Sequence, residues 1–199
     1  MEIRIYKGKE LKLLDEVYDP GEDSYLLVEA ALKEARPGDR ALEVGTGSGI
    51  VSLFVKDITR ITATDISPYA CRNARLNGVS VVRTDLFSGI RGKFDLIIFN
   101  PPYLPTAEDE RLHSWLNRAF DGGATGRREI ERFLEDTDRI LPPGGRVLTV
   151  FSSLTGIDEV RKLYEERGFF VEVVGEDKVS FEKLVVFRCV KKPRNRHIT

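Results

Sequence analysis

The 199-residue sequence has two cysteines, two histidines, one methionine, one tryptophan and no glutamine. Cys71 and Cys189 are too few for a disulfide framework, and His113 and His197 supply almost no zinc ligands. We therefore expect reduced, structural thiols and no metal. No apolar stretch is long enough to span a bilayer, and the N-terminal residues do not form a signal peptide. A cytoplasmic protein with no membrane association is the resulting expectation.

Neither sign of charge dominates, since 31 lysines and arginines face 32 aspartates and glutamates. A domain that grips duplex nucleic acid usually has a basic excess, so this balance argues against such a role without excluding it. Abundant ion-pairing residues with few labile ones are common in hyperthermophile proteins. The basic tail 191–199 is expected to fray, either as a solvated end or as an RNA-contacting tail.

Helical and strand patterns alternate along the chain, which is typical of an α/β domain with a largely parallel sheet and helices on both faces. The length suits a single domain with one sizeable core. The last two strands are close enough in sequence to pair antiparallel. We expect helices from Pro20 to Pro37 and at 50–57, 67–77, 127–141 and 158–167, and strands at 41–44, 61–64, 79–83, 94–99, 146–151, 169–174 and 183–190.

The tetrapeptide Asn100-Pro101-Pro102-Tyr103 follows the apolar run 94–99, which is short enough to be a buried strand. The asparagine carbonyl and the backbone carbonyl beside it can accept hydrogen bonds from a planar amide or amine. The prolines fix φ and lack an N–H, so the turn is stiff and rich in acceptors. The tyrosine ring can cover the flat face of the bound group. This pattern indicates a clamp for an exocyclic or amide nitrogen; the alternative is an ordinary proline-rich turn.

The segment Glu43-Val44-Gly45-Thr46-Gly47-Ser48-Gly49 lies between an expected strand and an expected helix. Glycines there let the backbone approach a ligand at the carboxyl edge of the sheet. The third glycine comes one position early for the dinucleotide pattern G-x-G-x-x-G, and the acid Glu43 precedes the loop. This spacing disfavours a nicotinamide oxidoreductase.

Two further acids follow successive strands. Asp65 can accept both hydroxyls of a ribose, while Asp85 can accept from an adenine amine with Leu86 flanking the ring. Alone, Asp65 could be a surface carboxylate and Asp85 a helix N-cap. Together they line strand ends as a nucleoside lying across the sheet requires, and Glu43 would face the positively charged end of that ligand.

The glycine loop, Asp65, Asp85 and the Asn100–Tyr103 clamp, in this order, resemble the class I methyltransferases that use S-adenosylmethionine, and more specifically the HemK-like protein-(glutamine-N5) methyltransferases. The segments Val17-Tyr18-x-Pro20-x-Glu22-Asp23-Ser24 and Phe120-Asp121-Gly122-Gly123-x-x-Gly126-Arg127 resemble the short archaeal and eukaryotic branch that acts on class I translation release factors. Phe120 and Asp121 stand where members of that branch vary. The resemblance runs from about Tyr18 to Val190.

The resemblance implies a single Rossmann-like methyltransferase domain. Its sheet should be seven-stranded and mostly parallel, with an antiparallel C-terminal strand. We expect an N-terminal extension 1–38, a cofactor-binding core 39–100, a substrate loop 101–126, a C-terminal half 127–190 and the tail 191–199.

The resemblance also assigns roles to residues. It implies S-adenosylmethionine as cofactor, S-adenosylhomocysteine as product, and no metal. The catalytic residues would be Asn100, Pro101 and Tyr103; the cofactor-binding residues Tyr18, Ser24, Glu43, Gly45, Thr46, Gly47, Gly49, Asp65, Ile66, Asp85, Leu86 and Asn100; and the substrate-binding residues Asn100, Pro101, Pro102, Tyr103, Glu22 and Asp23.

The clamp suggests a chemical hypothesis. Asn100 and the Pro101 carbonyl would each accept one N–H of a glutamine amide, turning its nitrogen toward the methyl group and stabilising positive charge as it develops. Tyr103 would pack against the amide plane. No strong general base is required.

Two other features lead to expectations. The segment 104–126 does not resolve into one element, and we favour a partly helical substrate cover over a passive loop, with His113 a surface residue. The strand 79–83 should be a sheet edge. The resemblance suggests that a small zinc-binding activator protein adds a strand there, whereas the alternative is a short edge protected by its own twist.

Three other functions stay open at this point. The clamp would serve an adenine or guanine amine of DNA or RNA equally well. Lysine methylation is chemically less suited, because an sp³ amine needs no planar clamp. A cofactor-binding module without catalysis is the non-enzymatic alternative.

Overall fold

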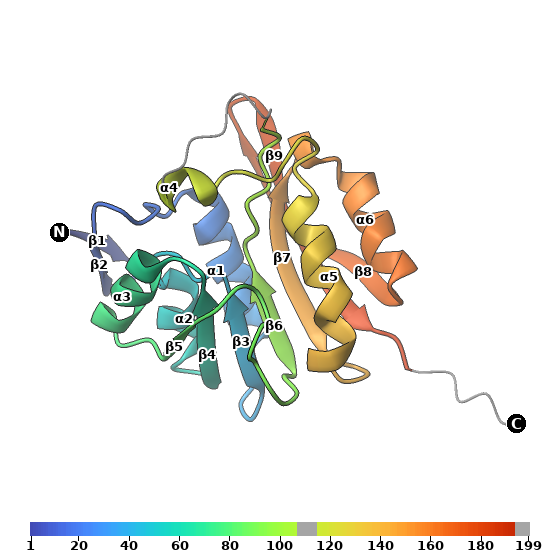
Figure 1. Cartoon of the computed structure of the whole chain (residues 1–199), viewed down its shortest axis with the longest axis horizontal. Coiled ribbons are helices and arrows are strands. Elements are labelled where there is room, and N and C mark those ends of the chain that lie inside the picture. The colour runs from blue at the N-terminus through green and yellow to red at the C-terminus, as the bar shows by residue number, and fades with distance from the viewer. Residues whose placement is uncertain (107–114, 194–199) are drawn as a thin grey trace, which may run out of the picture.

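A computed structural model describes residues 1–106 and 115–193. The expectations for His113 and for the end of the tail, 194–199, lie outside the described residues. The chain forms one sheet with helices on both faces and a small hairpin at its N-terminal end (Figure 1). Within the described ranges, no helix is long and apolar enough to cross a membrane.

The main sheet has seven strands in the order β5-β4-β3-β6-β7-β9-β8. The first five strands in this order run parallel, and β9 pairs antiparallel with both β7 and β8. The expected fold class is thereby confirmed, including the edge position of β5. The strands are β3 Arg40–Val44, β4 Arg60–Asp65, β5 Val81–Arg83, β6 Leu96–Phe99, β7 Arg146–Ser152, β8 Phe169–Val179 and β9 Glu182–Lys191.

Two groups of helices enclose this sheet. Helices α1 and α2 pack on one face with α3 beside them against β4 and β5, while α5 and α6 pack on the other face. Every residue of β6 and β7 is buried, as expected for central strands covered on both sides. The helices are α1 Glu22–Glu34, α2 Ile50–Val55, α3 Pro68–Leu76, α4 Trp115–Arg118, α5 Arg128–Ile140 and α6 Ile157–Glu166, with a 3₁₀ turn η2 at Ser153–Thr155.

An aromatic stack fixes the strand that leads into the clamp. Phe99, the last residue of β6, stacks on Phe133 of α5 with ring centroids 4.5 Å apart, and Phe133 also contacts Phe87. All three rings are almost fully buried. The residue that follows Phe99 therefore leaves the sheet from a rigid position.

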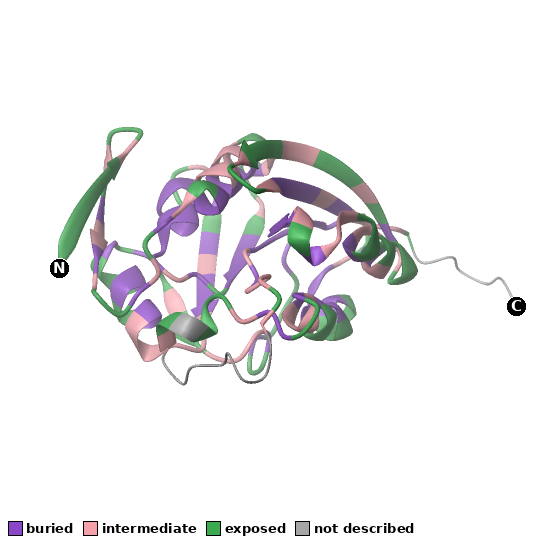
Figure 2. Ribbon diagram, turned by 90° about the horizontal axis from the view of Figure 1, so that it is seen from above, coloured by how far each residue is buried: buried purple, intermediate pink, exposed green. Residues whose placement is uncertain are grey.

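The N-terminal hairpin of β1 (Glu2–Tyr6) and β2 (Lys9–Leu13) is an element that the sequence did not predict. Its turn places Lys7 and Gly8 at positive φ, a conformation for which Asn-Gly is the usual signal. Asn77 connects the hairpin to the end of α3: its Oδ1 accepts a hydrogen bond from the Lys12 N–H, and its Nδ2 donates one to the Lys12 carbonyl. Strand β1 is exposed along most of its length, in contrast to the buried central strands (Figure 2).

Candidate active site

The candidate site is a pocket of about 600 Å³ above the carboxyl ends of β3, β4 and β6. The glycine loop between β3 and α2 forms its floor. Gly49, which caps α2, has φ +84°, and a Cβ there would lie 3.2 Å from the Cα of Ala74 in α3. Gly49 therefore lets the two helices pack closely. It does not line the pocket, unlike Gly45 and Gly47, so its position differs from the expected cofactor contact.

Glu43 braces the glycine loop from below. Its Oε2 atom accepts hydrogen bonds from Thr46 Oγ1 at 2.7 Å, from the Ser52 N–H at 3.1 Å and from the Ser52 hydroxyl. Burial raises the pKa of Glu43 to about 7, although these hydrogen bonds act in the opposite direction. The carboxylate thus holds the loop in shape as well as lining the pocket.

Asp65 at the end of β4 is held by backbone groups. Its two oxygens accept from the Gly47 N–H at 2.9 Å and the Ser67 N–H at 2.8 Å. Burial raises the pKa of Asp65 because it desolvates the charged form, and backbone hydrogen bonds act in the opposite direction. Ile66 follows it along the wall of the pocket.

Asp85 and Leu86 follow β5 on the adjacent wall. Asp85 Oδ2 lies 2.7 Å from Arg132 Nη2 of α5, and Arg132 is also bound by Glu129. Leu86 has φ +45°, a left-handed conformation that few non-glycine residues adopt. The loop therefore presents Leu86 to the pocket in a strained conformation, which is frequent at ligand sites.

A buried carboxylate, Asp23, organises the clamp. Asp23 lies in the first turn of α1 and is 5% exposed. Its Oδ2 accepts from Asn100 Nδ2 at 3.0 Å and from the Tyr103 hydroxyl at 3.1 Å, while its Oδ1 accepts from the Tyr18 hydroxyl at 3.1 Å. Because Asn100 donates through its nitrogen, its carbonyl oxygen lies on the opposite side of the planar amide as an acceptor.

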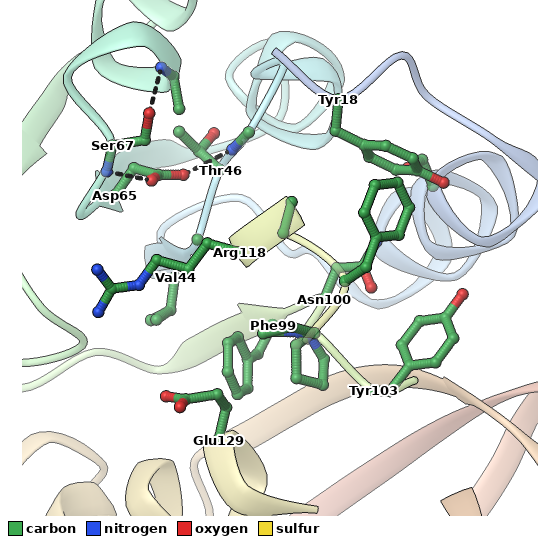
Figure 3. A pocket seen from close by; sticks show the side chains of 18 of the residues that line it. Tyr18, Val44, Thr46, Asp65, Ser67, Phe99, Asn100, Tyr103, Arg118 and Glu129 are labelled. Atoms are coloured by element: carbon green, nitrogen blue, oxygen red, sulfur yellow. Dashed lines mark hydrogen bonds between the residues drawn. The ribbon is translucent and has the colours of Figure 1, made fainter. Parts of the chain in front are cut away.

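The two tyrosines stay protonated in this arrangement. Burial first, and then the charge of Asp23, raise the pKa values of Tyr18 and Tyr103 well above the usual range. Both hydroxyls therefore act as donors to Asp23. Tyr18, Asn100 and Tyr103 gather on one side of the pocket, opposite Asp65 and Ser67 (Figure 3).

The glycine-rich stretch 122–126 supports the clamp from behind. A Cβ on Gly122 would lie 2.8 Å from the Pro102 carbonyl oxygen, and a Cβ on Gly126 would collide with the carbonyl of Tyr103. That carbonyl accepts a hydrogen bond from Thr155 Oγ1 at 3.0 Å. Only glycine fits this close approach of the two backbones, which gives the Gly122–Arg127 motif a physical reason.

The structure brings most of the predicted residues into one pocket. Tyr18, Glu22, Asp23, Ser24, Glu43, Gly45, Thr46, Gly47, Asp65, Ile66, Asp85, Leu86, Asn100, Pro101, Pro102 and Tyr103 all line it. Asp23 does so as an internal acceptor for Asn100, whereas the sequence predicted that it binds substrate.

Helix α4 and the residues after it, which belong to the segment 104–126 where we expected a partly helical substrate cover, also line the pocket. Other lining residues were not predicted: Glu129 and Arg132 project from α5, and Glu182 comes from the start of β9. These three residues belong to no spacing motif, and their arrival at the site depends on tertiary packing. Among the described residues, no cluster of three or more histidine, cysteine, aspartate or glutamate side chains could hold a metal ion, and Cys71 and Cys189 are buried free thiols.

The fold and the glycine loop define a Rossmann-like methyltransferase, and comparisons with known proteins agree. The family model of the methyltransferase small domain matches residues 16–178. The chain belongs to this family.

Two relatives and one solved structure match over nearly their whole length. A protein of Methanocaldococcus jannaschii, provisionally named a protein N5-glutamine methyltransferase, is 45% identical over 92% of this chain and 96% of its own. Human methyltransferase HEMK2 is 35% identical over 88% of this chain and 90% of its own. Among solved structures, Mtq2 of E. cuniculi, in complex with Trm112, superposes with a TM-score of 0.75 at 27% identity, covering 89% of this chain and 99% of that one. That complex is described as responsible for methylating the translation termination factor eRF1.

The raised pKa of Glu43 predicts a pH dependence of stability. The carboxyl pKa of Glu43 is about 7 in the folded protein and 4.5 ordinarily, so the folded state favours the protonated acid. The contribution of Glu43 to the free energy of unfolding is therefore complete below pH 4.5 and lost as pH rises through 7. The Glu43→Gln variant mimics the protonated acid at every pH. The wild type should lose about 3 kcal/mol relative to this variant between pH 4 and pH 8, measured by urea denaturation.

The exposed Glu165→Gln substitution on α6 is the control. A stability difference between wild type and Glu43→Gln that stays constant from pH 4 to pH 8, or a wild type that gains stability relative to the variant as pH rises, would contradict the assignment.

Proposed function

We propose that this protein is an S-adenosylmethionine-dependent methyltransferase that methylates the side-chain amide nitrogen of a glutamine in a protein. The substrate proposed is the Gly-Gly-Gln glutamine of a class I translation release factor. One observation carries the chemistry. Asp23 accepts a hydrogen bond from the side-chain nitrogen of Asn100, which leaves the side-chain carbonyl of Asn100 as the acceptor of the clamp. The names of the relatives support the choice of substrate. We also propose a cytoplasmic location, which a substrate that acts in translation supports.

The residues of the pocket fit the cofactor. Asp65 would hold the ribose hydroxyls, Asp85 and Leu86 the adenine, and the glycine loop the amino-acid end. The carboxylates of Glu43, which is buried, and of Asp65, which is partly buried, have no cationic partner in the described structure, which suits a ligand with positive charge. S-adenosylmethionine supplies a methyl group activated by sulfonium and leaves as S-adenosylhomocysteine.

The chain's own part in the reaction is to position an amide. An amide nitrogen is a poor nucleophile because its lone pair is delocalised into the carbonyl. Asn100 Oδ1 and the Pro101 carbonyl accept its two N–H groups, and Tyr103 packs beside its plane. These acceptors would stabilise the positive charge that develops on the amide nitrogen as it takes the methyl group, and the amide proton would then leave to solvent.

The decisive experiment uses labelled S-adenosylmethionine and a release factor containing Gly-Gly-Gln. We expect label in this release factor and none in the release factor whose Gly-Gly-Gln glutamine is replaced by alanine. The Asn100→Ala enzyme should bind cofactor as the wild type does, while kcat falls about 10²- to 10³-fold through loss of one positioned acceptor. Label in both release factors, label only in RNA, or wild-type turnover by Asn100→Ala would overturn the proposal.

Asp23 is proposed as the positioning residue of the clamp. Asp23→Ala removes the acceptor for Asn100, Tyr103 and Tyr18, and the loss of bonds to a charged group should lower kcat about 10- to 100-fold. Because Asp23 acts through Asn100, the substitution should add little in the Asn100→Ala background. Steady-state kinetics of the two single variants and the double variant measure this coupling. Strictly additive losses would show that Asp23 acts independently of the clamp.

We further propose that the edge strand β5 receives a strand from a small zinc-binding activator protein; the existence of a complex between Mtq2 and Trm112 supports a protein partner. Val82 is 45% exposed on this edge, and Arg75 Nη2 donates to the Val81 carbonyl at 3.3 Å. The isolated edge is thus partly protected by Arg75, which a pairing strand would displace.

Val82→Lys should weaken binding of the Trm112 relative from the same genome, measured by calorimetry, because a lysine would have to be buried at the new strand pair. Phe170→Lys, on the exposed β8 strand at the opposite edge, is the matched control. Equal affinities for the two variants would place the partner elsewhere.

A further inference from the structure

Glu182 is a pocket carboxylate that the proposed mechanism does not use. It is the first residue of β9, directly after the tight turn from β8, where it pairs with Val179. Both residues line the same pocket as Asn100 and Tyr103. The Oε2 atom of Glu182 is buried and accepts no hydrogen bond from the described part of the chain.

Two donors, the hydroxyl of Tyr103 in the same pocket and the ammonium of the next residue, Lys183, are already engaged elsewhere. The Tyr103 hydroxyl donates to Asp23, and Lys183 Nζ lies 2.7 Å from Glu176 Oε1. A buried acceptor without a partner costs about 1–3 kcal/mol, and more when it is charged. Such a group in a ligand pocket is explained when the ligand brings the missing donor.

The backbone of Glu182 is fixed relative to the clamp through η2. The neighbouring Lys183 N–H donates to Ser153 Oγ at 3.0 Å at one end of η2, and Thr155 Oγ1 at the other end donates to the Tyr103 carbonyl at 3.0 Å. A short rigid turn thus links the start of β9 to the residue that follows the clamp prolines. The spacing between Glu182 and Asn100 is therefore set by the fold before any substrate arrives.

We infer that Glu182 is a substrate-positioning residue. Its free oxygen accepts a hydrogen bond from a donor on the substrate polypeptide beside the methylated glutamine. This inference rests on the proposed function, because it assumes a polypeptide that presents an amide to Asn100. Glu182 then fixes the chain on which that amide is carried.

The test compares wild type, Glu182→Ala and Glu182→Gln on the intact release factor. For Glu182→Ala we expect the KM for the release factor to rise about 10- to 100-fold, because one hydrogen bond to a charged group is lost. The values of kcat and of cofactor affinity should stay unchanged. Binding of the release factor in the presence of S-adenosylhomocysteine should weaken by the same factor. Glu182→Gln keeps an acceptor, so it should recover most of the affinity for a peptide N–H. Failure of Glu182→Gln to recover would identify the donor as cationic.

A structural role predicts different results. Because Glu182 Oε2 has no hydrogen-bond partner in the parts of the chain that the structure describes, the Glu182→Ala variant should have a Tm equal to or above that of the wild type. Glu165→Ala on α6 is the control for loss of an exposed carboxylate. An unchanged kcat/KM, or a loss of cofactor affinity, would overturn the inference while wild-type methylation of the release factor still upheld the proposed function. If the wild type leaves the release factor unmodified, the proposed function fails and this inference fails with it.

Discussion

The candidate site depends on the carboxylate of Asp23. Asp23 comes from the first turn of α1, Tyr18 from the segment before it, and Asn100 and Tyr103 from the end of β6, about 80 residues later. One buried carboxylate thus joins the N-terminal segment to the central strand. Its acceptor-only chemistry fixes the direction of every bond around it, and so decides which atom of Asn100 is available to a ligand.

The electrostatics of the pocket follow from burial without counter-ions. Glu43 and Asp65 take their hydrogen bonds from hydroxyl and backbone groups, and burial raises both pKa values. Of the three strand-end carboxylates Glu43, Asp65 and Asp85, Asp85 is the one that pairs with an arginine in the described part of the chain. Negative charge is therefore least compensated on the side where a sulfonium or amino group would lie. A cationic ligand would relieve the desolvation of these carboxylates, whereas a neutral ligand of the same shape would not.

The parts of the structure that could be predicted from sequence depend on local signals. Apolar runs, the glycine loop and a proline after Ser67 mark strands and helix ends whose periodicity is read directly from the chain. The hairpin of β1 and β2 was not predicted, because Lys7 adopts a positive φ at a position where asparagine is the usual turn residue. The sequence shows that Asp23 and Glu182 are acidic, but their places in the pocket depend on the packing of segments that are distant in sequence. Such packing leaves no spacing pattern in a single chain.

The clamp and the choice of substrate are separable properties of this pocket. In the proposed clamp, Asn100 and Pro101 would recognise two N–H groups in one plane, a feature shared by a glutamine amide and a nucleobase amine. Discrimination must come from groups that meet the rest of the substrate, since specificity is a difference of binding free energies between competitors. The wall formed by η2 and the start of β9 is rigidly joined to the clamp and carries an unpaired acceptor. A polypeptide offers donors at regular intervals beside its side chain, so this wall favours a protein substrate over a flipped base.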